Sequence, residues 1–225
     1  LASFNSGVVT LNHEEEFWSS RSNQRKRTRF LPPKQRTIRP SIDSAEASFL
    51  FDSRLLNSQD NTYLRGYFQS WKYFAEVGEE IKERVVKLSS PSKWYLETLD
   101  SLRTGPPWIA VHMRIGNYVS HPGMGVAGEK YYRRAFRLLE QMGLAGMKIV
   151  VFSYSPEVAA GSSVFANRPG VDFFQSQENS DPIETLLLMS EASGLVMGNS
   201  TYSWWAAYLR QSTNRPVIYP RPWLD

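Results

Sequence analysis

The chain has 225 residues, 41% of them hydrophobic, and a formal net charge of +4, which suits one large or two small globular domains. Cysteine is absent, which excludes disulfide bridges, thiolate metal sites and a cysteine nucleophile. The histidines His13, His112 and His121 are scattered without metal-ligand spacing, so we expect no zinc site. The chain also lacks an apolar run of about 18 residues, the length that a membrane-spanning helix needs.

The first 45 residues show no sustained hydrophobic periodicity, but they contain a basic block. Eight basic and no acidic residues lie between Arg21 and Arg39. Such a block could bind nucleic acid, an anionic membrane surface or an acidic substrate. The nearby prolines equally favour a solvated loop. The block lacks the interleaved aromatic side chains typical of a groove for single-stranded nucleic acid, so we expect no nucleic-acid partner.

The middle of the chain leads to a clear boundary. Residues 63–68 form an aromatic, strand-like segment, and residues 79–88 and 92–102 have helical spacing. The sequence Thr-Gly-Pro-Pro at 104–107 then interrupts all regular structure. We therefore expect two regions, residues 1–104 and residues 105–225.

Beyond this boundary, strands and helices alternate with short connections. This pattern predicts an α/β fold with a doubly wound parallel sheet, which binds ligands at the carboxyl ends of its strands. Strands are expected at residues 108–113, 148–152, 171–174, 195–197 and 216–219. Helices are expected at residues 130–142, from 155, from 181 with Ile183, Leu186, Leu187 and Ser190 on one stripe, and at 203–210.

Residues 194–210 read as a strand, a tight turn and a helix. Ser200 or Thr201 is placed to cap the helix, whose free N–H groups and positive dipole end could cradle a phosphate. Many such units bind nothing, so a purely structural role is the alternative. The adjacent Trp204 and Trp205 point about 100° apart on a helix, and core packing is the simpler interpretation for at least one of them.

A second strand end meets the same crevice by the topology rule. His112 and Arg114 stand at the end of the 108–113 strand. An arginine there could bind phosphate oxygens with two N–H groups, and the histidine could donate to a phosphate or a sugar oxygen. A buried structural histidine and a surface ion pair are the alternatives.

Three blocks resemble glycosyltransferase family 11, the α1,2-fucosyltransferases. VHMRIGNYV at 111–119 resembles the H-x-R-R-x-D segment of fucosyltransferases, and GNSTYSWWAAYL at 198–209 resembles the family's N-S-T/S-x-S-W-W-x-A-x-L signature. YLRGYFQSWKYF at 63–74 is similar to the block Y-L-x-G-Y-F-Q-S-x-K-Y-F. Smaller matches at Tyr131-Tyr132, Phe152-Ser153 and Leu188-Met189-Ser190 occur in the family's order.

The resemblance implies a GT-B-like fold in which residues 105–225 bind the donor and residues 1–104 form part of the acceptor side. It implies an inverting transfer of fucose from GDP-fucose to a glycan hydroxyl, in an α1,2 linkage, without a required metal or other cofactor. Arg114 and His112 would serve catalysis, Arg114 by neutralising the departing GDP. The implied donor-binding residues are Arg114, His112, Asn117, Ser153, Asn199, Ser200, Thr201 and Ser203.

The sequence departs from the family pattern at the same pocket. Ile115 stands where the family has a second arginine, Asn117 where it has an aspartate, and Tyr154-Ser155 where an acidic pair often follows. Two alternatives to an active enzyme therefore stay open. One is an inactive relative that only binds nucleotide or glycan, and the other is an anion-surface binder that acts through Arg21 to Arg39.

No segment before residue 63 matches the family's G-G-L-G-N-Q loop. We therefore expect one wall of the cleft to be missing, and little transferase activity from residues 1–225 alone. The absence of an anchor and of cysteine favours a cytoplasmic enzyme, or one that contacts the inner membrane face through Arg21 to Arg39. The alternative is the Golgi lumen, if an anchor was removed.

Overall fold

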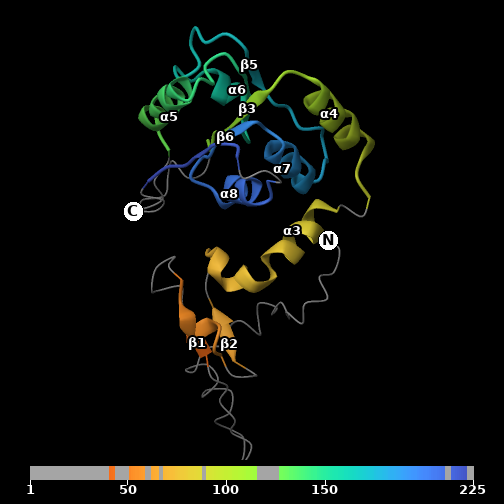
Figure 1. Cartoon of the computed structure of the whole chain (residues 1–225), viewed down its shortest axis with the longest axis vertical. Helices are drawn as coiled ribbons and strands as arrows, with labels where there is room; N and C mark the ends of the chain where they lie inside the picture. The colour runs from red at the N-terminus through yellow and green to blue at the C-terminus, as the bar shows by residue number, and fades with distance from the viewer. Residues whose placement is uncertain are drawn as a thin grey trace, which may run out of the picture. The chain divides into compact units, whose positions relative to one another are not determined.

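The computed structural model describes residues 41–43, 51–58, 62–65, 68–87, 90–115, 127–210 and 214–221. The chain forms two compact units, residues 1–78 and residues 79–225 (Figure 1). The division falls earlier than the boundary that we expected at residues 104–107. Helix α4 (Lys93–Thr104) packs on helix α7 (Pro182–Ser190), so it belongs to the second unit.

The first unit contains a small parallel sheet. Strand β1 (Ser41–Asp43) pairs with strand β2 (Tyr63–Arg65), with Ile42 opposite Leu64. Of the strand-like segment expected at 63–68, residues 63–65 form β2, and residues 66–67 lie outside the described residues. Strand β1 lies in the segment where the sequence showed no periodicity, because three residues are too few to display one.

Two short 3₁₀ helices accompany this sheet, η2 (Ser53–Leu55) and η3 (Trp71–Val77). The ring of Tyr73 lies 5.0 Å from that of Phe51 between centroids, and its hydroxyl oxygen accepts a hydrogen bond from the Asp52 N–H at 2.7 Å. Tyr73 thus provides local packing that joins η3 to the segment before η2.

The second unit is built on a five-stranded parallel sheet with the order β5-β4-β3-β6-β7. The chain starts in the middle at β3, proceeds outward through β4 and β5, and then returns to the other side of β3. This order confirms the doubly wound sheet that the alternating pattern predicted. The strands are β3 (Trp108–His112), β4 (Lys148–Phe152), β5 (Val171–Phe173), β6 (Gly194–Val196) and β7 (Val217–Ile218).

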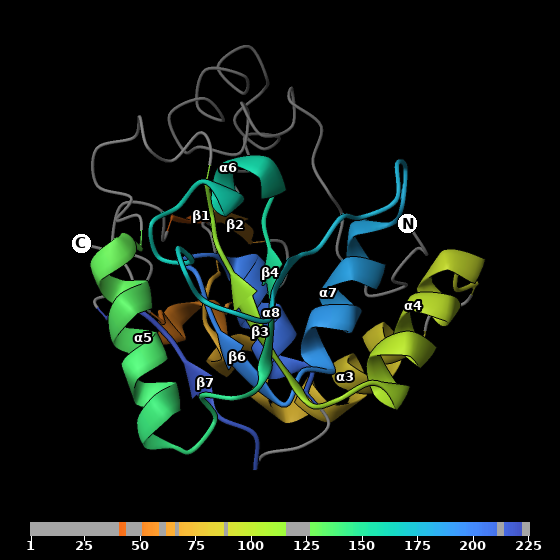
Figure 2. The same cartoon turned by 90° about the horizontal axis from the view of Figure 1, so that it is seen from above.

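Helices cover both faces of this sheet, as Figure 2 shows with α5 on one side and α4 and α7 on the other. Strand β3 is buried along its whole length, and its residues alternate between two cores. Ile109 and Val111 belong to the core under α5, whereas Trp108 and Ala110 belong to the core under α7 and α8. A strand covered on both faces reads as a continuous apolar run, which explains the sequence WIAVH.

The helices begin where the sequence places their signals. Helix α6 begins with Pro156 at its first position, and α7 is capped by the Asp181 carboxylate, which accepts from the Ile183 N–H at 2.9 Å. The helices of this unit are α3 (Gly78–Val86), α4, α5 (Glu129–Gln141), α6 (Pro156–Ala160), α7 and α8 (Thr201–Tyr208). The expected apolar stripe of α5 is confirmed, since its buried residues are Tyr132, Ala135, Phe136 and Leu139.

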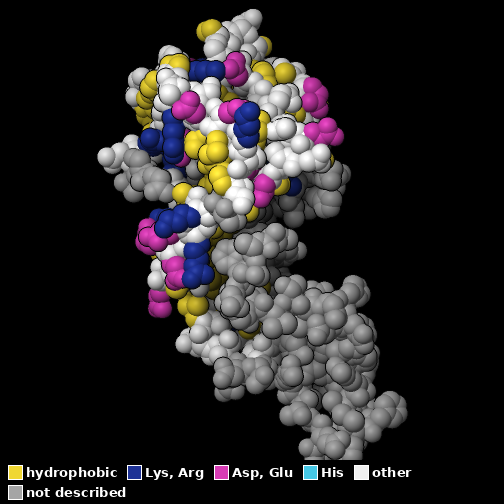
Figure 3. All heavy atoms as spheres, turned by 90° about the vertical axis from the view of Figure 1, so that its right-hand side faces the viewer, with side chains coloured by type: hydrophobic (Ala, Val, Ile, Leu, Met, Phe, Trp, Pro, Cys, Tyr) yellow, Lys and Arg dark blue, Asp and Glu magenta, His cyan; other side chains and the backbone are white. Residues whose placement is uncertain are grey.

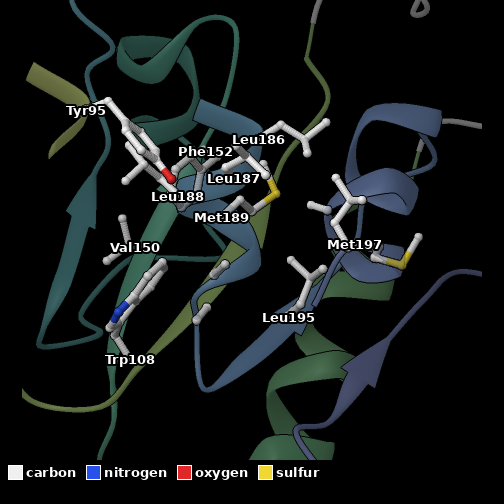
Figure 4. Close-up of a cluster of buried hydrophobic side chains, with 14 residues drawn as sticks. Tyr95, Trp108, Val150, Phe152, Leu186, Leu187, Leu188, Met189, Leu195 and Met197 are labelled. Carbon is white, nitrogen blue, oxygen red and sulfur yellow. The ribbon is translucent and has the colours of Figure 1, made fainter. Parts of the chain in front are cut away.

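Helix α7 differs from the single stripe that we expected. Ile183 is exposed, whereas the five consecutive residues from Leu186 to Ser190 are all buried. The helix contacts α4 and α8 as well as the sheet, so most of its circumference is covered. Figure 4 shows its leucines and Met189 beside Phe152 and Leu195 of the strands.

A buried carboxylate fixes α4 to α7. Glu184 is only 4% exposed, and its two oxygens accept hydrogen bonds from the N–H of Ser92 at 2.6 Å and from the Ser92 hydroxyl at 2.7 Å. Ser92 is the N-cap of α4, and its Oγ also accepts from the Tyr95 N–H at 3.0 Å. One residue of α7 therefore positions the first turn of α4.

We predict that Glu184→Gln lowers the free energy of unfolding by about 1.5–3 kcal/mol, because a charge-assisted acceptor becomes a neutral amide that also buries two donors. Chemical denaturation with the m-value monitored measures this change. Glu97→Gln is the matched control, since Glu97 forms only an exposed pair with Lys93 at 3.6 Å. An equal, small loss in both variants would contradict the structural role of Glu184.

Candidate functional site

The candidate site lies at the carboxyl ends of β3 and β6. These adjacent strands are the point where the order of the sheet reverses, and open α/β sheets place their ligands there. Residues 113–115 follow β3, and residues 197–200 follow β6 and lead into α8. The two segments that the sequence singled out are thus brought together.

Gly198 permits the close approach of these segments. A Cβ atom at this position would lie 2.8 Å from the carbonyl oxygen of His112, 3.1 Å from its Nδ1 and 3.4 Å from the backbone nitrogen of Arg114. The first distance is shorter than real Cβ contacts, and the oxygen belongs to the backbone and has little freedom to move. Only glycine therefore fits between the turn and the end of β3.

The turn after Gly198 ends in a capped helix. Ser200 is the N-cap of α8, with extended backbone angles and its Oγ accepting from the Tyr202 N–H at 3.3 Å. This settles the choice between Ser200 and Thr201, because Thr201 is the first helical residue and is exposed. Asn199 is half-buried beside it. The other N–H groups of the first turn have no helical carbonyl before them and face the strand ends.

Ser203 supports this turn from inside. Its side chain is fully buried, and its hydroxyl oxygen lies 3.1 Å from the Gly198 carbonyl oxygen and 3.0 Å from that of Ser200. The hydroxyl can donate to only one of them at a time, yet both contacts hold the turn against the helix. Ser203 thus stabilises the conformation of the turn at residues 198–200.

Two tyrosines at the start of α5 join the strand ends. The Tyr132 hydroxyl donates to the His112 carbonyl at 3.0 Å, and the Tyr131 hydroxyl lies 2.7 Å from the Met197 carbonyl oxygen and 3.1 Å from that of Ile218. Burial raises the pKa of both phenols, so they stay protonated donors. In the sequence, this pair is only a small match to the family. Its hydrogen bonds to the ends of three strands could not be predicted from the neighbouring residues.

His112 is buried and electrically neutral. Its ring lies 5.8 Å from that of Tyr202 between centroids. Burial, together with the positive charge of Arg114, lowers its pKa from 6.5 to about 4. Its Nδ1 has no hydrogen-bond partner within the described part of the chain. At neutral pH the site therefore has a neutral imidazole next to a permanently charged guanidinium.

The remaining predicted residues are placed as follows. Arg114 is half-buried just beyond β3, and the neighbouring Ile115 packs against the core under α5. Ser153 is half-buried at the end of β4, where its Oγ accepts from the Ser155 N–H at 3.3 Å. Asn117 lies outside the described residues, as does the block from Arg21 to Arg39.

The two tryptophans of α8 are half-buried and pack against the margin of a hydrophobic core. This position agrees with the core-packing interpretation. Trp204 stacks on Tyr208 with centroids 5.2 Å apart and planes 10° apart, and Trp205 meets Trp204 edge-on at 5.2 Å. The ammonium group of Lys82 on α3 lies 4.9 Å from the centre of the Tyr208 ring. This aromatic group therefore joins α3 to α8.

In the described ranges, no three histidine, acidic or cysteine side chains gather closely enough to hold a metal ion. Nor does any helix of the described residues have the length and apolarity needed to cross a membrane.

A family model, Glycosyl transferase family 11, matches residues 47–220. The chain belongs to this family. The match covers the end of the first unit and most of the second, and it includes every predicted site residue. The family therefore accounts for the signature at 198–209, which here forms the turn after β6 and the whole of α8.

Individual relatives agree with the family assignment. The chain is 30% identical over 118 residues to an O-antigen biosynthesis glycosyltransferase, WbnK, of Escherichia coli, covering 51% of this chain and 38% of that protein. It is 27% identical over 170 residues to an alpha-1,2-colitosyltransferase of Escherichia coli, covering 71% and 55%. The chain thus spans about half the length or less of these family members. A crystal structure of POFUT1 with GDP matches with a TM-score of 0.41 at 14% identity, covering 71% of this chain and 54% of that one.

We predict that His112 makes stability depend on pH. Because its folded pKa is about 4 and its unfolded pKa about 6.5, the unfolded chain binds the extra proton between these values. The free energy of unfolding should therefore fall by roughly 1–3 kcal/mol as the pH drops from 6.5 to 4. Denaturant titrations across this range measure the slope.

His112→Asn should remove most of this dependence, whereas His13→Asn should retain it. An unchanged slope in His112→Asn would show that the imidazole is not the responsible group. Since carboxylates also titrate near pH 4, the difference between the two variants carries the test and the absolute slope does not.

Proposed function

We propose that the chain belongs to an inverting glycosyltransferase that moves fucose from GDP-fucose to a glycan hydroxyl in an α1,2 linkage, with the donor bound by residues 105–225. The observation that carries the proposal is the convergence of Arg114 and the N-terminus of α8 at the reversal point of a doubly wound sheet. Membership of family 11 supports the reaction type. The relative that transfers colitose supports a deoxysugar donor as the wider class.

Arg114 is the residue that we assign to the diphosphate. A guanidinium offers two parallel N–H groups to phosphate oxygens and keeps its charge at every physiological pH. When the acceptor hydroxyl attacks the sugar carbon from the opposite face, the bond from that carbon to the diphosphate breaks and negative charge develops on GDP. A fixed cation beside that oxygen lowers the barrier, because its attraction grows as the charge develops.

The N-terminus of α8 supplies a second electrostatic contribution. Its free N–H groups and dipole favour an anion, and Asn199, Ser200 and Thr201 surround it. The Ser200 hydroxyl already serves the cap, so we assign phosphate contacts to the exposed Thr201 and to backbone N–H groups. Ser153 and Asn117 complete the proposed donor set.

His112 and Ser203 are proposed as positioning residues. The neutral imidazole of His112 adds no charge to the site and packs against the turn at Gly198. The backbone carbonyl of His112 accepts a hydrogen bond from the Tyr132 hydroxyl. Ser203 holds the turn itself. Direct catalysis is thereby left to Arg114, and the glycan acceptor is assigned to the region before residue 105.

A specific observation favours a second candidate, nucleotide binding without efficient transfer. The second arginine of the family motif is replaced by Ile115, whose side chain packs in a core and carries no charge to the site. One charge-assisted contact is worth roughly 1.5–3 kcal/mol, so its loss costs about ten- to a hundredfold in rate or binding. Binding and turnover must therefore be measured separately.

We predict that Arg114→Gln weakens GDP binding at least about tenfold, because a bidentate charged contact to phosphate is lost. Calorimetric titration of GDP into the wild-type chain and the variant measures this. Arg134→Gln, an exposed arginine on α5 away from the strand ends, is the control and should bind GDP like the wild type.

Absence of GDP binding in the folded wild-type chain, or equal binding in Arg114→Gln, would contradict the proposed donor site. GDP binding without turnover of GDP-fucose is expected of both candidates for residues 1–225 alone, whereas turnover with a galactoside acceptor would contradict the second candidate.

A further inference from the structure

Helix α5 has a basic outer face that takes no part in the candidate site at the ends of β3 and β6. Its stripe of buried residues faces the sheet, and the opposite side of the helix lies outside, as Figure 2 shows. Only Glu129 and Glu140 are acidic in this helix. The basic residues are Lys130, Arg133, Arg134 and Arg137, and Arg168 joins them from the segment before β5. By contrast, the face in Figure 3 intersperses both signs of charge.

A surface pocket of about 320 Å³ lies between α5 and the segment that joins α6 to β5. Its lining residues are Arg133, Phe136, Arg137, Val164 and Arg168. Phe136 and Val164 are buried and form an apolar floor, whereas the arginines form the rim. The volume is at the small end of the roughly 300–1,000 Å³ of small-molecule pockets.

Two of the three arginines are held in place by local contacts. Arg133 Nη2 lies 2.6 Å from the Ser163 hydroxyl and 3.5 Å from the Glu129 carboxylate. The Arg168 guanidinium lies 4.3 Å from the centre of the Phe136 ring and pairs with Glu140 at 3.3 Å. Each guanidinium has five N–H donors, and these contacts use only some of them. The remaining N–H groups of Arg133 and Arg168 can therefore donate to a ligand.

Arg137 differs from the other two. None of the carboxylates that the structure describes forms an ion pair with it, although it stands one helical turn from Arg133 on the same face. Like charges at this spacing repel each other. The pocket therefore keeps an uncompensated positive charge beside two partly compensated ones, a cost that an anion would relieve.

We propose that this pocket is a second anion site, which binds a phosphate-bearing ligand independently of the switch point. Several guanidinium groups around one small pocket match the several oxygens of a phosphate, which accepts two parallel N–H bonds from each arginine. The local carboxylates already neutralise parts of Arg133 and Arg168, so the remaining positive charge comes mainly from Arg137 and favours an anionic group. The apolar floor leaves room for the organic part of such a ligand.

Inorganic pyrophosphate is the probe, followed by NMR amide shifts of the full 225-residue chain. We expect saturable shifts in residues 133–137 and 164–168, and a dissociation constant raised about tenfold or more in Arg137→Gln. Arg134→Gln is the matched control, because it removes the same charge from the same helix outside the pocket. It should change the constant less than about twofold.

Shifts that are absent, that are confined to residues 112–115 and 198–203, or that weaken equally in Arg134→Gln and Arg137→Gln would overturn the proposal. Because the shifts are assigned residue by residue, failure of the donor site would remain distinguishable from failure of this pocket.

A second arm identifies the source of the phosphate. Co-sedimentation with vesicles of phosphatidylglycerol, compared with vesicles of phosphatidylcholine, tests a lipid headgroup. Binding to the anionic vesicles that is lost in Arg137→Gln and competed by pyrophosphate would indicate a headgroup. Pyrophosphate binding without vesicle binding would indicate a soluble phosphate ester.

Discussion

The candidate site depends on the close contact between Gly198 and the end of β3. A side chain at Gly198 would lie 2.8 Å from the His112 carbonyl oxygen, so the turn after β6 touches the backbone of the central strand. This contact sets where α8 begins and how near its N-terminus comes to Arg114. Tyr132 and Ser203 hold the two sides of it, one through the His112 carbonyl and the other through the carbonyls of the turn.

The electrostatics of the site follow from the same packing. Tight enclosure removes water from His112, which keeps the imidazole uncharged, and the Arg114 side chain lies half-buried beside it. Among the described residues at the strand ends, the site therefore combines the Arg114 guanidinium with the dipole of α8. Such a combination favours an anion with charge spread over several oxygens, which is what a departing nucleoside diphosphate offers. Under the proposed function, Arg114 would carry a larger share of this stabilisation than the family pattern implies, because Ile115 stands in place of the neighbouring arginine.

Most of the second unit could be predicted from the sequence, because its strands are short runs of five or fewer residues between strong turn signals. The stripe of α5 and the proline that opens α6 were local features of this kind. The burial pattern of helix α7 could not be predicted locally, since the burial of Leu186 to Ser190 depends on α4 and α8 as well as on the sheet. The division of the chain after Gly78 was missed for the same reason, because α4 is held by Glu184 from 92 residues away.

The candidate site shows the same limit. His112, Arg114 and Ser200 could be placed at strand and helix ends by periodicity and topology. The steric need for Gly198 and the hydrogen bonds of Tyr131 could not, because they depend on carbonyl groups of strands that are distant in sequence. The arginine pocket on α5 likewise forms only when Arg168 is brought beside Arg133 and Arg137.

Amide hydrogen exchange with and without GDP tests the central claim most directly. The account predicts added protection confined to residues 112–115 and 198–203, at the two ends that Gly198 brings together. Protection elsewhere in the chain with none in these segments, or no change at saturating GDP, would contradict the assignment of the β3–β6 edge as the donor site.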